Sequence, residues 1–352
     1  MSQQKHVYIV PHSHVQLQNN LFNKSGDVGQ RTWAFVKDYC AERDILLDTV
    51  DYWKPGESED SSLFVLTHPN EDLAHRLVYL FRVIRMKVFG TPYYKIKYFG
   101  FNRFLKQFSK KVLFHGEAEV VIPSVFRNLE RLKRIYDKIY LMRQTDEFGY
   151  LLDPQLYDSP VEPYFSNKDR KFLVMMNNNK KPAVRGNELY SERLRAIKYF
   201  SKTGEFDLYG GRWDRHIYFP YTLYKKYVKK THRGYSNNKL ETVSRYKFAI
   251  CFENEIAPGF VTEKILDCLL VGTVPVYWGA PNITDFVPAN CFIDFRKFKN
   301  YDALLEYLKK ITPEEMEEYR NNMRAYYKSQ MFQIFTKPYF ARAVLEAIDK
   351  YL

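Results

Sequence analysis

The sequence is poor in cysteine and has no long apolar run, and both features exclude whole classes of protein. Only four of its 352 residues are cysteine and none forms a CxxC pair, so neither a disulfide framework nor a cysteine zinc module is expected. No apolar stretch approaches the roughly 18 residues of a membrane span, and the opening residues, MSQQKHVYIV, lack the apolar segment of a signal peptide. We therefore expect a soluble cytoplasmic protein.

Acidic residues are also in short supply. The 41 Asp and Glu residues are outnumbered by 54 Lys and Arg residues, which gives a formal net charge of +13. The excess lies in two stretches rich in aromatic residues, Arg85 to Lys111 and Arg212 to Leu240. Such a surface can bind anionic lipid headgroups or phosphorylated ligands, which makes peripheral contact with an anionic membrane a candidate interaction. The alternative is a solvated rim with the rings packed inwards, and we do not expect nucleic acid as a partner.

The chain alternates between strand-like and helix-like segments in both halves. Runs such as HVYIV and KFLVMM read as strands, and stretches of helical periodicity follow them. The proline-containing segment Leu151 to Phe165 lies between the two halves and is the best linker candidate. This pattern predicts an α/β protein of two Rossmann-like domains, over residues 1–160 and 161–352, with two helices at the C-terminal end.

The segment Tyr246 to Trp278 reads as strand, loop, helix and strand, and it carries the strongest chemical signal. Thr262 is a good N-cap for the helix. A helix N-terminus that follows a strand favours phosphate, so Lys264 can contact a diphosphate while Glu263 accepts hydrogen bonds from a ribose diol. The alternative is purely structural: Thr262 only caps the helix, Glu263 complements its dipole and Lys264 is solvated.

This segment resembles the family 10 fucosyltransferases, the α-1,3/1,4 enzymes that use GDP-fucose. The donor signature of that family runs as FEN, a short loop, and an aromatic residue followed by V-T-E-K, and here it stands as Phe252-Glu253-Asn254 and Phe260 to Lys264, with a VPVYWG strand after it. Where the family often has Tyr, this chain has Phe260, so a hydroxyl contact to the donor is absent or replaced. The resemblance implies five donor-binding residues here: Asn254, Phe260, Thr262, Glu263 and Lys264.

Two further matches lie upstream. The segment Glu188 to Gly211 is similar to the helix and strand of the family that carry a diphosphate-binding arginine, which selects Arg193, with Arg185 as the alternative. The motif FHGEAE is similar to the segment with the proposed catalytic base, which selects Glu117, with Glu119 as its competitor. An inverting transfer needs such a base on the acceptor side to remove the hydroxyl proton.

The resemblance implies a GT-B fold, in which two Rossmann-like domains face a central cleft. The N-terminal domain would bind the acceptor, the C-terminal domain would bind the GDP-sugar, and the last helices can pack back on the N-terminal domain. The implied reaction moves L-fucose from GDP-β-L-fucose to a hydroxyl of a GlcNAc-containing oligosaccharide or lipid-linked glycan and forms an α-1,3-type fucoside. We expect no metal and no other cofactor, because arginine, lysine and a helix N-terminus can stabilise the leaving diphosphate. The alternatives are another GDP-sugar or acceptor, or a non-catalytic glycan- or membrane-binding protein.

Overall fold

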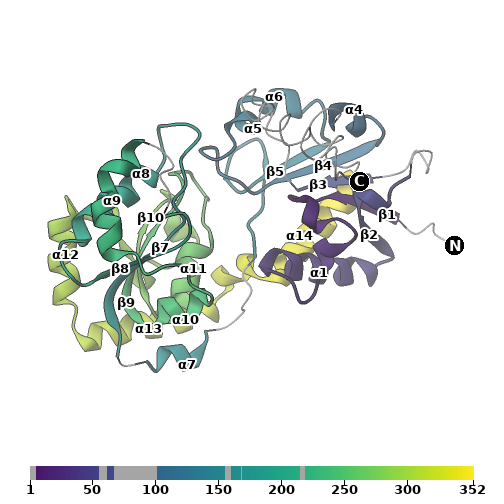
Figure 1. Cartoon of the computed structure of the whole chain (residues 1–352). Helices are drawn as coiled ribbons and strands as arrows, with labels where there is room; N and C mark the ends of the chain where they lie inside the picture. Colours follow the sequence, from purple (N-terminus) through teal and green to yellow (C-terminus); the bar gives the residue numbers. More distant parts are fainter. Residues whose placement is uncertain (1–4, 55–61, 67–100, 155–159, 168, 215–218) are drawn as a thin grey trace. The chain divides into compact units, whose positions relative to one another are not determined.

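The computed structural model describes residues 5–54, 62–66, 101–154, 160–167, 169–214 and 219–352. The chain forms two compact units, one of Met1–Leu156 with Ile334–Leu352 and the other of Tyr157–Gln333. Each unit is a sheet with helices on its faces (Figure 1). The predicted α/β class with two Rossmann-like units is therefore confirmed. The predicted basic stretch Arg85 to Lys111 lies mainly outside the described residues.

The first unit contains a parallel sheet with the strand order β2-β1-β3-β4-β5-β6. The central strands are apolar on both faces, as expected for a parallel sheet covered on both sides. The strands span the following residues: β1 Lys5–Val10, β2 Ile45–Thr49, β3 Ser62–Val65, β4 Lys110–His115, β5 Lys138–Leu141 and β6 Gly149–Tyr150.

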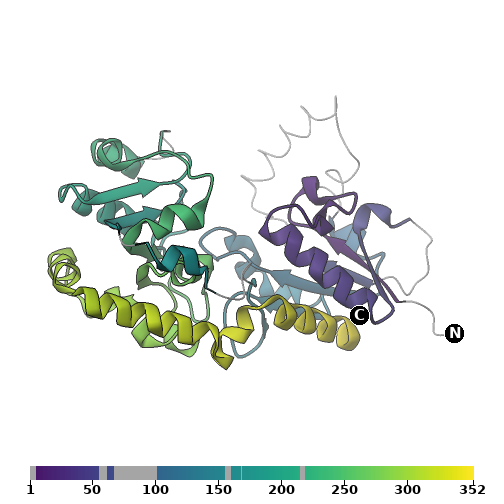
Figure 2. The ribbon, with the colours of Figure 1, turned by 90° about the horizontal axis from the view of Figure 1, so that it is seen from below.

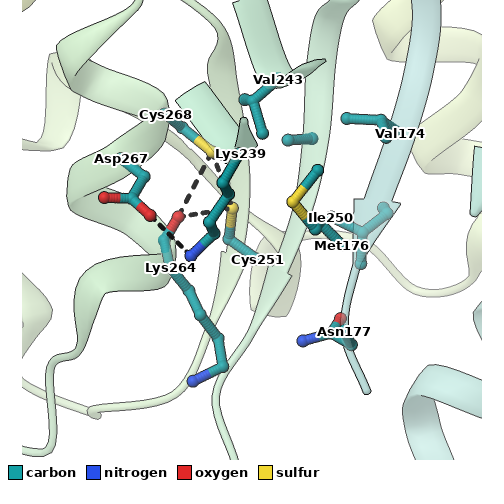
Figure 3. A pocket seen from close by; sticks show the side chains of 11 residues that line it. Val174, Met176, Asn177, Lys239, Val243, Ile250, Cys251, Lys264, Asp267 and Cys268 are labelled. Carbon is teal, nitrogen blue, oxygen red and sulfur yellow. Dashed lines mark hydrogen bonds and ion pairs between the residues drawn. The ribbon is translucent and has the colours of Figure 1, made fainter. Parts of the chain in front are cut away.

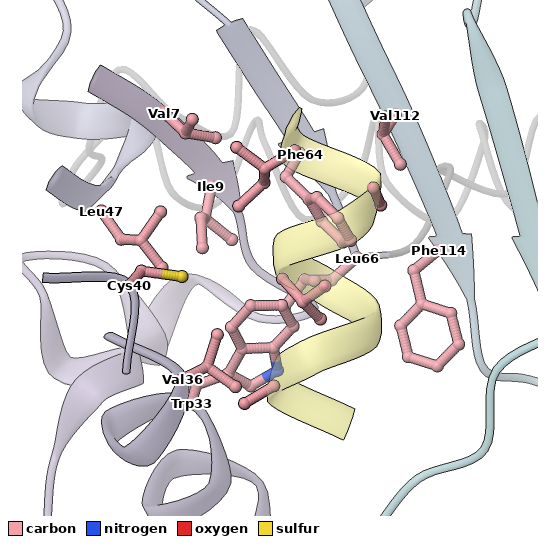
Figure 4. Packing of buried hydrophobic residues seen from close by; sticks show 14 of the residues in the cluster. Val7, Ile9, Trp33, Val36, Cys40, Leu47, Phe64, Leu66, Val112 and Phe114 are labelled. Atoms are coloured by element: carbon pink, nitrogen blue, oxygen red, sulfur yellow. The ribbon is translucent and has the colours of Figure 1, made fainter. Parts of the chain in front are cut away.

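Two helices from opposite ends of the chain cover one face of this sheet. Helix α1, Val28–Ala41, begins with a capping box between Asp27 and Gln30. Helix α14, Lys337–Tyr351, runs beside it (Figure 2). The side chains of Trp33 and Phe64 pack in the shared core, which Figure 4 shows around α14. The C-terminal helix is therefore part of the first unit.

The other face carries shorter helices. The aromatic rings of Phe104 and Phe108 pack there with Val125 and Leu132. These elements and the turns of the unit span α4 Phe101–Leu105, α5 Pro123–Arg127, α6 Leu129–Leu132, η1 His14–Gln16, η2 Asn20–Phe22 and η3 Val50–Tyr52.

The second unit contains a parallel sheet with the strand order β11-β10-β9-β7-β8. Sequence order reverses between β7 and β9, because β8 lies on the outer side of β7 while β9 to β11 extend the sheet the other way. The strands span β7 Lys171–Met176, β8 Phe206–Tyr209, β9 Tyr246–Phe252, β10 Val274–Trp278 and β11 Ile293–Asp294.

Helices cover both faces of the second sheet (Figure 1), with α8, α9 and α12 on one side and α10, α11 and α13 on the other. Within the described residues, no helix is both long and apolar enough to cross a membrane. The elements span α7 Glu162–Phe165, α8 Tyr190–Phe200, α9 Phe219–Thr231, α10 Lys239–Ser244, α11 Glu263–Leu270, α12 Tyr301–Lys310, α13 Pro313–Tyr327, η4 Ile283–Asp285, η5 Ala289–Cys291, η6 Phe295–Lys297 and η7 Gln330–Phe335.

Candidate functional site

The candidate site lies at the carboxyl ends of β7 and β9. In an open parallel sheet, ligands bind outside the carboxyl ends of the strands at the point where the strand order reverses. Strand β9 ends at Phe252, and the loop after it leads into α11, which begins at Glu263. Five of the seven residues predicted from the sequence lie in this loop and in the first turn of α11, with Asn254 near the start of the loop.

The loop is held by a buried carboxylate. The side chain of Glu253 has no solvent exposure and accepts hydrogen bonds from the backbone N–H of Thr262 at 2.9 Å and from its hydroxyl at 2.8 Å. Gly279 makes room for it, because a Cβ atom there would lie 2.5 Å from the Glu253 Cγ atom. Glu253 thus fixes the start of α11 against the end of β9.

Lys264 is part of the same network. Its ammonium lies 3.0 Å from the Glu253 carboxylate and 2.9 Å from the Thr262 hydroxyl. The Thr262 hydroxyl also caps the helix by accepting from the Lys264 backbone N–H at 3.5 Å. An ammonium has three N–H donors, so one remains for an anion at the helix N-terminus. The solvated alternative for Lys264 is wrong, since its side chain is only 13 % exposed.

Glu263 projects from the first turn of α11 with 53 % of its side chain exposed. Its Oε1 atom lies 3.6 Å from the Lys239 ammonium and 3.9 Å from the Lys264 ammonium. Desolvation alone would raise the pKa of this carboxyl group, but Lys264 and Lys239 outweigh it and lower the pKa to about 2. Glu263 is therefore ionised at neutral pH and acts only as a hydrogen-bond acceptor.

Lys239 is a site residue that the sequence analysis did not single out. It is the first residue of α10, after the N-cap Asn238, and its ammonium lies 2.6 Å from the Asp267 carboxylate. Burial would lower the pKa of this ammonium, but Glu263 and Asp267 raise it. No local motif marks Lys239, because its partners lie on a helix more than twenty residues further along the chain.

A small cavity of about 20 Å³, room for about one water molecule, lies between β7, β9, α10 and α11. Figure 3 shows Lys239, Lys264 and Asn177 around it, with the thiols of Cys251 and Cys268 on its inner wall. The thiols are 3.3 Å apart, and both donate to the Lys264 carbonyl. The two thiols therefore bind a backbone carbonyl in the first turn of α11 and help to hold that turn against β9.

Arg193 is buried, with 4 % of its surface exposed, and its guanidinium donates hydrogen bonds to protein oxygen atoms. It donates to the Phe252 carbonyl at 2.7 Å and to the Asn254 side-chain oxygen at 3.0 Å. Burial lowers the pKa of the guanidinium. Arg193 thus holds the end of β9 and the Asn254 amide. Arg185, the alternative, is exposed on the loop between β7 and α8.

Two other predicted residues have different surroundings. Phe260 is 3 % exposed, so its ring packs inside the second unit. In the first unit, Glu117 follows β4 and is exposed, whereas its competitor Glu119 accepts from the Arg143 guanidinium at 2.8 Å. Within the part of the chain that the structure describes, no group of three or more His, Cys, Asp or Glu residues is arranged to hold a metal ion.

Comparison with known proteins places this geometry in a family. A model described as glycosyltransferase family 10 (fucosyltransferase), C-terminal region, matches residues 166–345. The chain is 46 % identical over 78 residues to the alpha-(1,3)-fucosyltransferase FucT of Helicobacter pylori, an alignment covering 22 % of this chain and 16 % of that protein. It is 37 % identical over 116 residues to alpha-(1,3)-fucosyltransferase B of Drosophila melanogaster, covering 33 % of this chain and 25 % of that protein. These alignments thus span a quarter or less of each relative.

Solved structures are similar over nearly the whole chain but at low sequence identity. A crystal structure of an alpha1,3-fucosyltransferase with GDP has a TM-score of 0.51 at 16 % identity and covers 99 % of this chain and 92 % of its own. An alpha-glucosyltransferase in complex with UDP-glucose and DNA has a TM-score of 0.52 at 11 % identity and covers 98 % and 99 %. At these identities the likeness supports the fold, the GT-B class, and nothing finer.

Proposed function

Because the chain belongs to glycosyltransferase family 10, we propose that it transfers L-fucose from GDP-β-L-fucose to a hydroxyl of a GlcNAc-containing glycan and forms an α-1,3-type fucoside. The observation that carries the proposal is the fixed group of Glu253, Thr262 and Lys264 at the N-terminus of α11. It presents an ammonium and the positive end of a helix dipole at the reversal point of the second sheet, where a diphosphate is favoured.

The donor contacts follow from this placement. The Lys264 ammonium and the N-terminal end of α11 face the diphosphate, and the Glu263 carboxylate accepts hydrogen bonds from the ribose diol. Arg193 donates three of its five N–H groups to the Phe252 carbonyl and the Asn254 side-chain oxygen, so it holds Asn254 and the loop in place. The N–H groups on its Nη1 atom can donate to the diphosphate, and the exposed Arg185 on the loop before α8 is the alternative. The second unit would bind the donor and the first unit the acceptor.

The chemical step is an inverting displacement. The acceptor oxygen bonds to the anomeric carbon of fucose, the bond from that carbon to the diphosphate oxygen breaks, and GDP leaves. We assign the base that takes the hydroxyl proton to Glu117, because its side chain is exposed just after β4, where an acceptor hydroxyl can reach it. Lys264, Arg193 and the helix N-terminus stabilise the charge that develops on the diphosphate, so the step is expected to need no metal ion.

A transfer assay tests the proposed function. The protein is incubated with GDP-fucose and N-acetyllactosamine, with and without a chelator, and the product is examined by NMR. The expected result is an α-linked fucoside at the O3 position of GlcNAc, formed at the same rate in both samples. Transfer from GDP-mannose, or only to another acceptor, would show that the chain is a glycosyltransferase with a different donor or acceptor from the one proposed. No transfer from any GDP-sugar would favour a non-catalytic glycan-binding protein.

A face of α9 suggests where the enzyme works. Lys225, Lys226, Lys229 and Lys230 are exposed on one side of the helix together with Leu223, which is 63 % exposed. Among the described residues, none of these ammonium groups has a carboxylate within 4.0 Å. Unpaired lysines around an exposed leucine fit an anionic lipid surface, because the cations meet the headgroups while the apolar side chain enters the interface.

We therefore propose peripheral contact with an anionic membrane, on the cytoplasmic side. The four cysteines are free and buried, as is usual for a protein of a reducing compartment. Sedimentation with vesicles of phosphatidylcholine alone or with phosphatidylserine at low salt tests the contact. We expect binding to the anionic vesicles only, and loss of binding when the four lysines of α9 are replaced by Gln. Equal behaviour of both vesicles, or of the parent and the Gln variant, would contradict it.

A further inference from the structure

We propose that Lys239 is a positioning residue for recognition of the ribose, because it holds the Glu263 carboxylate in the orientation that accepts hydrogen bonds from the ribose hydroxyls of the donor. The inference rests on the proposed function, in which Glu263 reads the ribose. It adds a residue from a different element, α10, to a site otherwise formed by the loop after β9 and by α11.

The geometry places Lys239 between two carboxylates of α11. Glu263 and Asp267 are four residues apart and therefore lie on the same side of the helix. The Lys239 ammonium is 2.6 Å from the Asp267 carboxylate and 3.6 Å from that of Glu263 (Figure 3 shows the contact with Asp267). The capped start of α10 fixes the backbone from which Lys239 projects, since the Asn238 side chain accepts from the Glu241 N–H at 3.1 Å.

The charges explain why the ammonium is needed. Two carboxylates at this spacing repel each other, and without a cation between them Glu263 would turn away from Asp267. Desolvation and the neighbouring Glu263 raise the pKa of Asp267 even with Lys239 present. Lys264 is the only other described cation recorded in an ion pair with Glu263, but it is farther away, at 3.9 Å, and is held by Glu253 at 3.0 Å. Lys239 is therefore the nearer of the two cations and the one that lies between the two carboxylates.

If Lys239 holds Glu263, removing Lys239 should change how well the protein distinguishes nucleotides with a ribose diol from nucleotides without one. A carboxylate held in place accepts two hydrogen bonds from a vicinal diol, and each charge-assisted bond contributes several-fold to affinity. A nucleotide without the two hydroxyls loses these bonds. Removing Lys239 should weaken GDP binding more than binding of 2′,3′-dideoxy-GDP, whereas damage to the fold alone would weaken both by the same factor.

Isothermal titration with both nucleotides tests the inference. We expect the parent protein to prefer GDP by about tenfold or more, Lys239→Met to lose most of this preference, and Lys239→Arg to keep most of it. Asp267→Asn leaves Lys239 with Glu263 as its single acidic partner in this pair, so it should keep the preference and provides a second variant if Lys239→Met folds poorly. Lys309→Met, which breaks an exposed pair with Glu205 at 3.3 Å, is the matched control.

The outcomes separate this inference from the proposed function. If Lys239→Met keeps the preference for GDP, the role of Lys239 is wrong and the donor assignment stands. The same conclusion holds if Asp267→Asn loses as much of the preference as Lys239→Met does. A parent protein that binds both nucleotides equally shows that Glu263 does not read the ribose, which also overturns it. If neither nucleotide binds, the proposed donor is wrong and the inference fails with it.

Discussion

At the scale of single residues, carboxylates of the same chemistry have separate roles because their surroundings differ. Glu253 is buried and bonded to Thr262 and Lys264, so it is structural. Glu119 is paired with Arg143, whereas Glu117 is exposed at the end of β4. A general base must keep its carboxylate accessible to the acceptor hydroxyl, which favours Glu117 over Glu119.

Replacing Glu117 by Gln should therefore reduce kcat by about 10²- to 10⁴-fold, because the proton acceptor is lost while the shape is kept. The affinity for GDP should not change. The measurement compares transfer rates and GDP titrations for Glu117→Gln and for the matched control Glu119→Gln, which removes the charge paired with Arg143. Near-normal turnover in Glu117→Gln, or an equal loss in both variants, would mean that Glu117 is not the base.

The lowered pKa of Glu263 predicts a pH dependence of stability. Its pKa falls from 4.5 to about 2 on folding, because Lys264 and Lys239 outweigh the desolvation of the group. A depressed acid pKa stabilises the folded state above the unfolded pKa, and this contribution is lost as the pH falls from about 4.5 towards 2. In urea titrations, the stability difference between the parent and Glu263→Gln should be largest near pH 6 and shrink by pH 3. A constant difference would show that the charge of Glu263 is not stabilised by the lysines.

At the scale of elements, the N-terminus of α11 depends on one hydroxyl group. Thr262 caps the helix and donates to Glu253 through the same side chain. Thr262→Val should lower the free energy of unfolding by about 1–2 kcal/mol, since the cap and the buried hydrogen bond are both lost. Thr262→Ser keeps the hydroxyl and should cost far less. Urea unfolding of the two variants measures the difference, and a loss in Thr262→Ser as large as or larger than that in Thr262→Val would contradict the role of the hydroxyl group.

The local sequence predicted the strand, loop and helix around the N-terminus of α11, but it did not predict which side chains from other elements contact them. The strand, loop and helix of residues 246–270 follow from an apolar run, a Pro-Gly loop and a capping threonine, all close together in the chain. The burial of Arg193 and the pairing of Lys264 with Glu253 depend on how β9, α8 and α11 pack. The sequence therefore indicated Arg193 as a donor contact but not its hydrogen bonds to the end of β9, and Lys239 was missed.

At the scale of the whole molecule, the last helix completes a unit that begins at the other end of the chain. The side chain of Phe340 in α14 is 1 % exposed, and its ring lies 5.7 Å from Trp33 and 6.0 Å from Phe114. The sequence indicated a C-terminal helix, but its site of packing is set by contacts more than 200 residues apart, which no local pattern records.

Phe340→Ala should destabilise the first unit by about 3–5 kcal/mol, the cost of removing a buried aromatic ring and leaving a cavity. The neighbouring Tyr339 is 44 % exposed, so Tyr339→Ala provides a control on the same helix and should cost much less. Urea unfolding followed by tryptophan fluorescence measures both variants. Equal, small effects would mean that α14 contributes little to the stability of the first unit.

The central claim is that the chain binds a guanosine diphosphate sugar at the N-terminus of α11. A thermal-shift titration with GDP, GDP-fucose, GDP-mannose and UDP-GlcNAc tests it most directly, because a ligand that binds only the folded state stabilises it by about 2.7 kcal/mol at 100 times its Kd. We predict that GDP and GDP-fucose raise the Tm of the parent protein and that Lys264→Met abolishes the shift. The absence of a shift with every guanosine nucleotide, or an equal shift in Lys264→Met, would contradict the claim.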